Sequence, residues 1–116
     1  MAKFEIKGQL FDCNFASSAF AKKVQVAALT FSKKQEEAEK QAGRPYAEIV
    51  QTGHDICSEF IDTVFGEGKS KELFPEGDWL EMEDTLADFL LFMKNETQNI
   101  IKRRADILKK YKAITK

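Results

Sequence analysis

The residue types that most often carry out catalysis meet at one place in the sequence, the segment from residue 54 to residue 57. His54 is the single histidine of the 116 residues, and Cys57 follows three positions later. That spacing places both side chains on one face of a helix, as a cysteine–histidine nucleophile pair requires. Cys57, however, falls within an apolar stripe, where a free cysteine behaves as a small core residue. The sequence also offers neither an oxyanion loop nor a third orienting residue, so we predict no catalytic residues and no enzyme activity.

Three carboxylates in the last predicted helix could offer oxygen ligands to a hard cation. Glu81, Asp84 and Asp88 share one helix face at spacings of three and four. The sequence lacks the alternating Asp/Asn pattern of calcium loops and the Glu-x-x-His motif of carboxylate di-iron bundles. Because carboxylates in the opening turns of a helix are usually partners of the helix dipole, we predict no metal site and no cofactor.

The segment Gly66-Glu67-Gly68-Lys69-Ser70 ends in Gly-Lys-Ser, as phosphate-binding loops do. The phosphate loop, however, has four residues between its glycines and follows a strand, whereas one residue separates these glycines and a helix precedes them. A helix C-terminus presents carbonyl groups, which repel phosphate. We therefore interpret the segment as a helix stop followed by a sharp turn.

A basic stretch near the C-terminus could contact nucleic acid. It comprises Lys102, Arg103, Arg104, Lys109, Lys110 and Lys112, which project to more than one side of a helix. Tyr111 is the one aromatic neighbour on which a base could stack. A solvated helix end accounts for this pattern, and nucleic acid is an unlikely partner.

Composition bounds the protein class. Residues 1–116 have room for a single domain, and ten phenylalanines among 43% apolar residues predict an aromatic core. The net charge of −1 provides no strong field toward nucleic acid or membrane. Cys13 and Cys57 lack metal-ligand spacing, and we expect them to stay reduced. The first residues, MAKFEIKG, do not resemble a signal peptide, and the longest apolar run, residues 89–93, is too short to span a membrane. We expect a soluble cytoplasmic chain.

The elements that position these residues predict a mainly α fold. Residues 3–7 alternate polar and apolar, Gly8-Gln9 turn the chain, and residues 10–15 return as a second strand. A lone hairpin is marginal in water, so it must lie on the helices or be extended by a partner strand. The expected elements are a β-hairpin over residues 1–15, helices over residues 17–42 and 45–65, a short connecting turn over residues 70–74, and a long C-terminal helix over residues 79–114.

The first helix is predicted to begin with Ser17 or Ser18 as cap and to be solvated in its polar second half, after Ser32. Gly43 ends it and Pro45 suits the first turn of the next helix. That central helix carries a broad apolar face and stops at two glycines that can adopt left-handed backbone. The face consists of Ile49, Ile56, Phe60, Ile61, Val64 and Phe65, with Gly53 and Cys57 on the same side.

The last helix, capped by Asp78 with Glu81 in a capping box, carries a regular apolar seam. The seam steps alternately by four and three, as in a coiled coil, through Leu86, Leu90, Met93, Thr97, Ile100, Arg104, Ile107, Tyr111 and Ile114. We predict that Leu86, Leu90 and Met93 pack on Phe60 and Val64. An unbroken helix over these residues spans about 55 Å, whereas a compact domain of this size is only about 35 Å across. Its end must therefore fray, bend back or pair with another chain.

Residues 60–74, FIDTVFGEGKSKELF, carry a resemblance to small proteins of tailed phages and prophages of Gram-positive bacteria. In those proteins a helix ends in the motif F-G-E-G-[TK]-[SA]-x-x-[LI]-F after a short N-terminal hairpin, and they are similar to tail assembly chaperones. The resemblance is strong over residues 56–74, weak over the hairpin, and slight over residues 15–45 and 94–116. After Phe74 those proteins usually have Gly-Gly-Lys, where this chain has Pro-Glu-Gly-Asp.

The resemblance implies a non-enzymatic, phage tail assembly chaperone-like protein that binds tape-measure or tail-tube subunits in the cytoplasm of the bacterial host. It also implies a recognition surface at the turn, formed by Phe65, Gly66, Glu67, Gly68 and Phe74. The seam predicts a second surface, for a protein partner or a weak homo-oligomer, formed by Ile100, Arg104, Ile107, Tyr111 and Ile114. Two alternatives are a structural virion component of the tail region and a small nucleic-acid-binding regulator.

Overall fold

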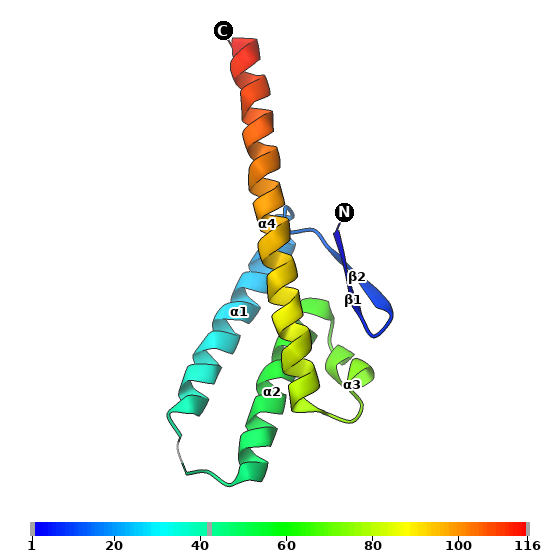
Figure 1. Cartoon of the computed structure of the whole chain (residues 1–116), viewed down its shortest axis with the longest axis vertical. Coiled ribbons are helices and arrows are strands. Elements are labelled where there is room, and N and C mark those ends of the chain that lie inside the picture. Colours follow the sequence, from blue (N-terminus) through cyan, green and yellow to red (C-terminus); the bar gives the residue numbers. More distant parts are fainter. Residues whose placement is uncertain (1, 42, 116) are drawn as a thin grey trace.

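The computed structural model describes residues 2–41 and 43–115, and its longest helix extends well beyond the rest of the molecule (Figure 1). The fold is mainly α, with an N-terminal antiparallel hairpin followed by helices. The elements are β1 (Ala2–Ile6), β2 (Gln9–Cys13), α1 (Ser18–Glu39), α2 (Tyr46–Phe65), α3 (Lys69–Leu73) and α4 (Trp79–Thr115). The molecule measures 66 × 32 × 19 Å along its principal axes, because α4 forms a single continuous helix.

The hairpin turns one residue earlier than the predicted Gly8-Gln9. Ile6 pairs with Gln9, so Lys7 and Gly8 form a two-residue loop with φ of 50° and 83°. A two-residue turn whose twist matches that of the strands needs positive φ at both positions, and glycine adopts this conformation readily. The hairpin lies against the helices, which is the first of the two predicted alternatives: the centroid of the Phe4 ring is 5.2 Å from that of Phe89.

α1 and α2 run side by side as an antiparallel pair (Figure 1). α1 begins after Ser17, as predicted, but ends at Glu39 instead of residue 42, which lies outside the described residues. Its polar second half is mostly exposed, as predicted. Lys34 of α1 nevertheless forms an ion pair with Glu59 of α2, so this half runs along α2.

The core is aromatic, as the composition predicted, and Phe89 of α4 lies at its centre, fully buried. Its ring contacts those of Phe4, Phe15, Phe60, Phe65 and Phe92, at centroid separations between 5.1 and 6.3 Å. Such packing contributes beyond the burial of area alone. Strands, α2 and α4 are therefore held together by one cluster of phenylalanine rings.

Leu86 is buried and Met93 packs against the core, as predicted, but two other predicted core positions differ in the structure. Leu90 is 37% exposed, whereas Met82 and Phe89 are fully buried. The buried residues Met82, Leu86 and Phe89 also step by four and three, but Phe89 takes the inward position that the predicted seam gave to Leu90. Ile49, near the start of α2, is also exposed.

Candidate protein-interaction surfaces

The turn between α2 and α3 has the predicted left-handed backbone, with φ of 127° at Gly66 and 83° at Gly68. Asp62 holds both sides of the turn together. Its main-chain oxygen accepts a hydrogen bond from Gly66 N at 3.1 Å, and its Oδ1 accepts one from Ser70 N at 2.8 Å. The carboxylate thus satisfies a free N–H at the start of α3, as a capping side chain does.

The two phenylalanines of this turn point into the molecule. Phe74 is buried, with Lys7 Nζ 4.6 Å from its ring centroid, and Phe65 packs half-buried against Phe11 and Phe89. The exposed part of the predicted recognition surface is therefore Glu67 and Gly68. Phe65 and Phe74 shape the turn from inside.

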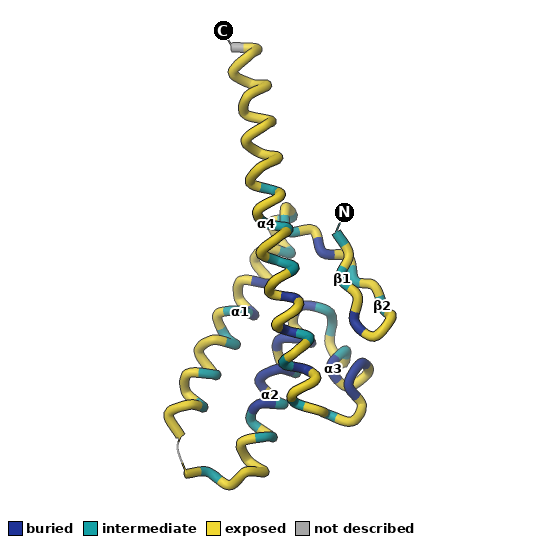
Figure 2. The backbone as a smooth tube through the Cα atoms, viewed as in Figure 1, coloured by how far each residue is buried: buried dark blue, intermediate teal, exposed yellow. Residues whose placement is uncertain are grey.

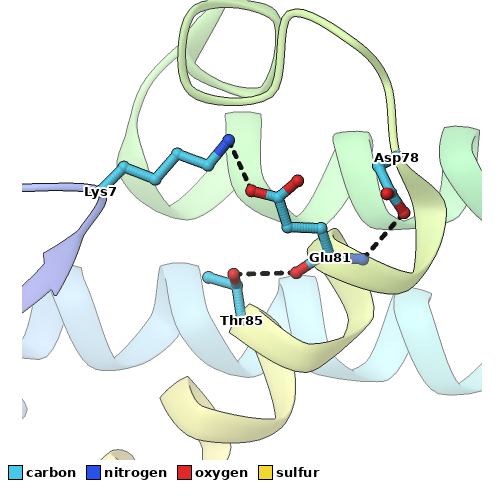
Figure 3. A network of polar contacts seen from close by, with 4 residues as sticks. All are labelled: Lys7, Asp78, Glu81 and Thr85. Atoms are coloured by element: carbon cyan, nitrogen blue, oxygen red, sulfur yellow. Dashed lines mark hydrogen bonds and ion pairs between the residues drawn. The ribbon is translucent and has the colours of Figure 1, made fainter.

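A small polar network fixes the start of α4 beside the hairpin (Figure 3). Asp78 Oδ1 accepts a hydrogen bond from Glu81 N at 3.2 Å, which is the predicted N-cap interaction. The Glu81 carboxylate does not complete the predicted capping box: it pairs with Lys7 Nζ at 2.6 Å instead. Thr85 Oγ1 donates to the Glu81 carbonyl oxygen at 3.0 Å. The hairpin turn places the Lys7 ammonium group over this helix end, so the Glu81 carboxylate pairs with it in place of the capping-box hydrogen bond.

The outer part of α4 is exposed over all of residues 101–114 (Figure 2). Of the predicted partner-binding residues, Arg104, Ile107, Tyr111 and Ile114 lie there, and Ile100 is half-buried at its base. Ile114 is 79% exposed. Over the described residues α4 is one continuous helix to Thr115, so an apolar line remains uncovered on the single chain.

Two further apolar residues extend this surface, Ile101 and Leu108, of which Ile101 is 70% exposed. They are seven positions apart, so they lie on the same face of the helix, two turns apart and next to the seam. The sequence contained this signal, since the pair repeats at heptad spacing beside Ile100 and Ile107. The predicted seam omitted Ile101 and Leu108, because it included only positions that alternate strictly by four and three.

A groove separates α1 from the inner half of α4, a feature that the sequence did not indicate. Its upper part, toward the outer half of α4, has a volume of about 340 Å³ between Val24, Leu29 and Met93. Its middle part, nearer the start of α4, has a volume of about 400 Å³ between Phe31, Glu36 and Leu90. Ala28 lines both parts, which are mainly apolar. The groove forms because α1 and α4 both pack on α2 without closing on each other.

Cys57, the residue weighed as a nucleophile, is fully buried in the core. Burial, with a smaller effect from Glu83, raises the pKa of the Cys57 thiol to about 12, so the nucleophilic thiolate is scarce at neutral pH. His54 Nδ1 lies 3.1 Å from Asp55 Oδ1. Within residues 2–41 and 43–115, no group of three or more His, Cys, Asp or Glu could hold a metal ion. In the same ranges, no helix is both long and apolar enough to cross a membrane.

The chain belongs to a family described as "Family of unknown function (DUF6673)", whose model matches residues 7–116. No curated protein and no solved structure matches the chain. The match includes α1 to α4 and β2, so both candidate surfaces lie within the part of the chain that defines the family.

Proposed function

We propose that this chain is a non-enzymatic assembly factor of tailed phages or prophages, similar to tail assembly chaperones. It would bind an apolar segment of a tape-measure or tail-tube subunit in the cytoplasm of the bacterial host until that subunit is incorporated. The observation that carries the proposal is the exposed apolar line of α4, from Ile101 to Ile114, which continues the groove between α1 and the inner half of α4.

The turn after α2 supports the phage assignment. Residues 65–74 match every position of the motif by which the chain resembles these phage proteins. The structure gives the motif a physical reason: Gly66 and Gly68 adopt positive φ, while Phe65, Leu73 and Phe74 return the chain to the core. A holding factor also needs apolar surface that its own fold leaves uncovered, since exposed apolar patches mark protein-binding sites.

Co-expression tests this function directly. The chain is tagged and expressed with the tape-measure or tail-tube protein encoded in the same genome, and the amount of co-purified subunit is measured. We expect stable co-purification and a higher soluble yield of the subunit. Ile107→Asp with Ile114→Asp should abolish capture, because a charge in the contact must be desolvated without a partner.

A matched control adds the same two charges on the opposite side of α4, as Asn95→Asp with Ala113→Asp. Both positions are exposed and lie away from the seam. This variant should retain capture. Equal loss in both double variants would indicate a general effect of charge, and absence of capture by the parent chain would refute the proposed function.

The alternative of a structural virion component predicts that the chain stays in the finished particle. Mass spectrometry of purified particles distinguishes the two, because a chaperone is released before completion. The third reading, a nucleic-acid-binding regulator, rests on the exposed basic residues of outer α4. It predicts DNA binding that weakens steeply with salt and is insensitive to Ile107→Asp with Ile114→Asp.

A further inference from the structure

The single chain exposes more surface than a compact protein of its mass. Its accessible area is 8272 Å², whereas a compact chain of 13.2 kDa exposes about 6,400 Å². Its radius of gyration is 17.7 Å, against about 13 Å for a compact domain of this length. A standard interface buries about 800 Å² on each partner, so a surplus of roughly 1,900 Å² is sufficient for a stable contact.

Charge along α4 and its approach is segregated. Residues 72–88 hold seven carboxylates and no cation, while residues 94–116 hold eight cations and two carboxylates. Two copies of α4 side by side in parallel would place like charges together, and Arg104 near its own copy. In an antiparallel pair each acidic half faces a basic half, and Arg104 approaches the inner half of the other copy.

The groove beside the inner half of α4 is about as long as the outer half of the helix. It borders α4 from Glu83 to Thr97, a length of about 21 Å at the rise of an α-helix, and residues 100–114 span the same length. The walls of the groove are apolar near Met93, and Glu36 and Glu39 border its middle part. The groove continues toward the start of α4 into a pocket of about 400 Å³ bordered by Glu39, Glu83 and Arg44, and Arg44 is paired with Glu48. A second α4 that ran antiparallel would bring Lys110 and Lys112, which lie on either side of the seam, to these carboxylates.

We propose that this chain forms an antiparallel homodimer, in which the outer half of each α4 lies in the groove between α1 and α4 of the other copy. Ile107, Leu108 and Ile114 fill the apolar groove, and the basic end of each helix faces the acidic border of the other copy. The proposal concerns the free protein and does not depend on the proposed function. A client subunit would compete with the second copy for the same surface.

The arrangement is symmetric and closes on itself, since each copy gives one helix half and accepts one. Burial of the apolar residues supplies affinity, while the charges fix the antiparallel direction. Because the charged border is exposed, added salt should weaken the dimer without abolishing it.

The mass in solution provides the first test. Sedimentation of the full chain should give twice 13.2 kDa at high concentration and fall toward one chain on dilution. Ile107→Asp with Ile114→Asp should give one chain throughout, while Asn95→Asp with Ala113→Asp should dimerise like the parent. Circular dichroism establishes that each variant is folded. One-chain mass for the parent at every soluble concentration would overturn the proposal, as would a dimer that persists in the first variant.

Charge reversal tests the contact between border and helix end. Glu36→Lys with Glu39→Lys should weaken the dimer at least tenfold, and adding Lys110→Glu with Lys112→Glu should restore much of the lost affinity. Glu37→Lys, an exposed position of α1 outside the groove, serves as the control. If the four substitutions together weaken association further, the acidic border does not face the basic end.

Cross-linking fixes the direction of the helices. The native Cys13 and Cys57 are buried, so an introduced surface cysteine reacts selectively. Glu83→Cys and Ile114→Cys should cross-link when the two variants are mixed, and neither should cross-link to itself. Self-cross-linking of Ile114→Cys would show a parallel pair and overturn the antiparallel arrangement.

Discussion

The indole ring of Trp79 lies directly against the main chain of Gly53. A Cβ atom at residue 53 would come within 2.3 Å of the indole Cε2 and Nε1 atoms. Trp79 is the first residue of α4 and Gly53 lies on the buried face of α2, so this contact sets how closely the start of α4 approaches α2. A glycine that costs helix stability in α2 is therefore required by the packing of a neighbouring helix.

Gly53→Ala should destabilise the protein. Overpacking costs about 1–3 kcal/mol and exceeds the gain of about 1 kcal/mol that alanine offers in a helix. Chemical denaturation measures the change, with Thr63→Ala on the exposed side of α2 as control. Trp79→Phe should reduce the penalty of Gly53→Ala, because the smaller ring leaves room. An alanine variant as stable as the parent would show that the indole moves aside freely.

Gly68→Ala should lower stability by about 1 kcal/mol or more. A Cβ at this position would have no described atom within 4 Å, so the penalty arises from the left-handed backbone alone. Gly68→Asn should cost less, because asparagine tolerates this conformation. Glu67→Ala, between the two glycines, provides the control. If Gly68→Ala and Gly66→Ala both melt like the parent, the turn accepts another backbone conformation.

Much of the fold could be predicted from the sequence, because local rules determine it. Gly66 and Gly68 predicted the stop of α2, and the period of apolar residues predicted a mainly α fold. The positions of Leu90 and Ile49 could not be predicted, because their exposure depends on where α1 and α4 end up relative to α2. For the same reason the groove had no signal in the sequence: it is bordered by residues far apart in the chain.

Alkaline pH should destabilise the protein through Cys57. Burial raises the pKa of this thiol from an ordinary value of 9.0 to about 12. Below pH 9 the thiol is protonated in both states, so its contribution is fully present. Between pH 9 and 12 only the unfolded chain releases the proton, and stability falls by about 1.4 kcal/mol per pH unit.

The comparison of the parent with Cys57→Ala isolates this effect. Their difference in unfolding free energy should shrink by about 1.4 kcal/mol between pH 7 and pH 10, because the alanine variant lacks the titrating group. The cavity left by the substitution contributes equally at both pH values. A constant difference would mean that Cys57 ionises in the folded protein as readily as in the unfolded chain.

Chelation should leave the melting temperature unchanged. The Glu81 carboxylate is already paired with Lys7, and Asp84 and Asp88 are exposed to solvent. The measurement is a thermal melt with and without excess chelator. Calcium or magnesium added afterwards serves as the control. A drop of several degrees that the added cation reverses would establish a metal site at the start of α4.

Deletion of residues 104–116 should leave a folded chain, since the described residues from 101 onward are exposed and the phenylalanine cluster ends at Phe92. At low protein concentration, where the full chain is monomeric, the two should melt within a few degrees of each other. At high concentration the full chain should melt higher, because association stabilises only the folded state. Thermal melts over a dilution series measure both effects. If the truncated chain is unfolded even at low concentration, the outer part of α4 belongs to the folding unit of the single chain. In that case its exposed apolar line is not reserved for a partner.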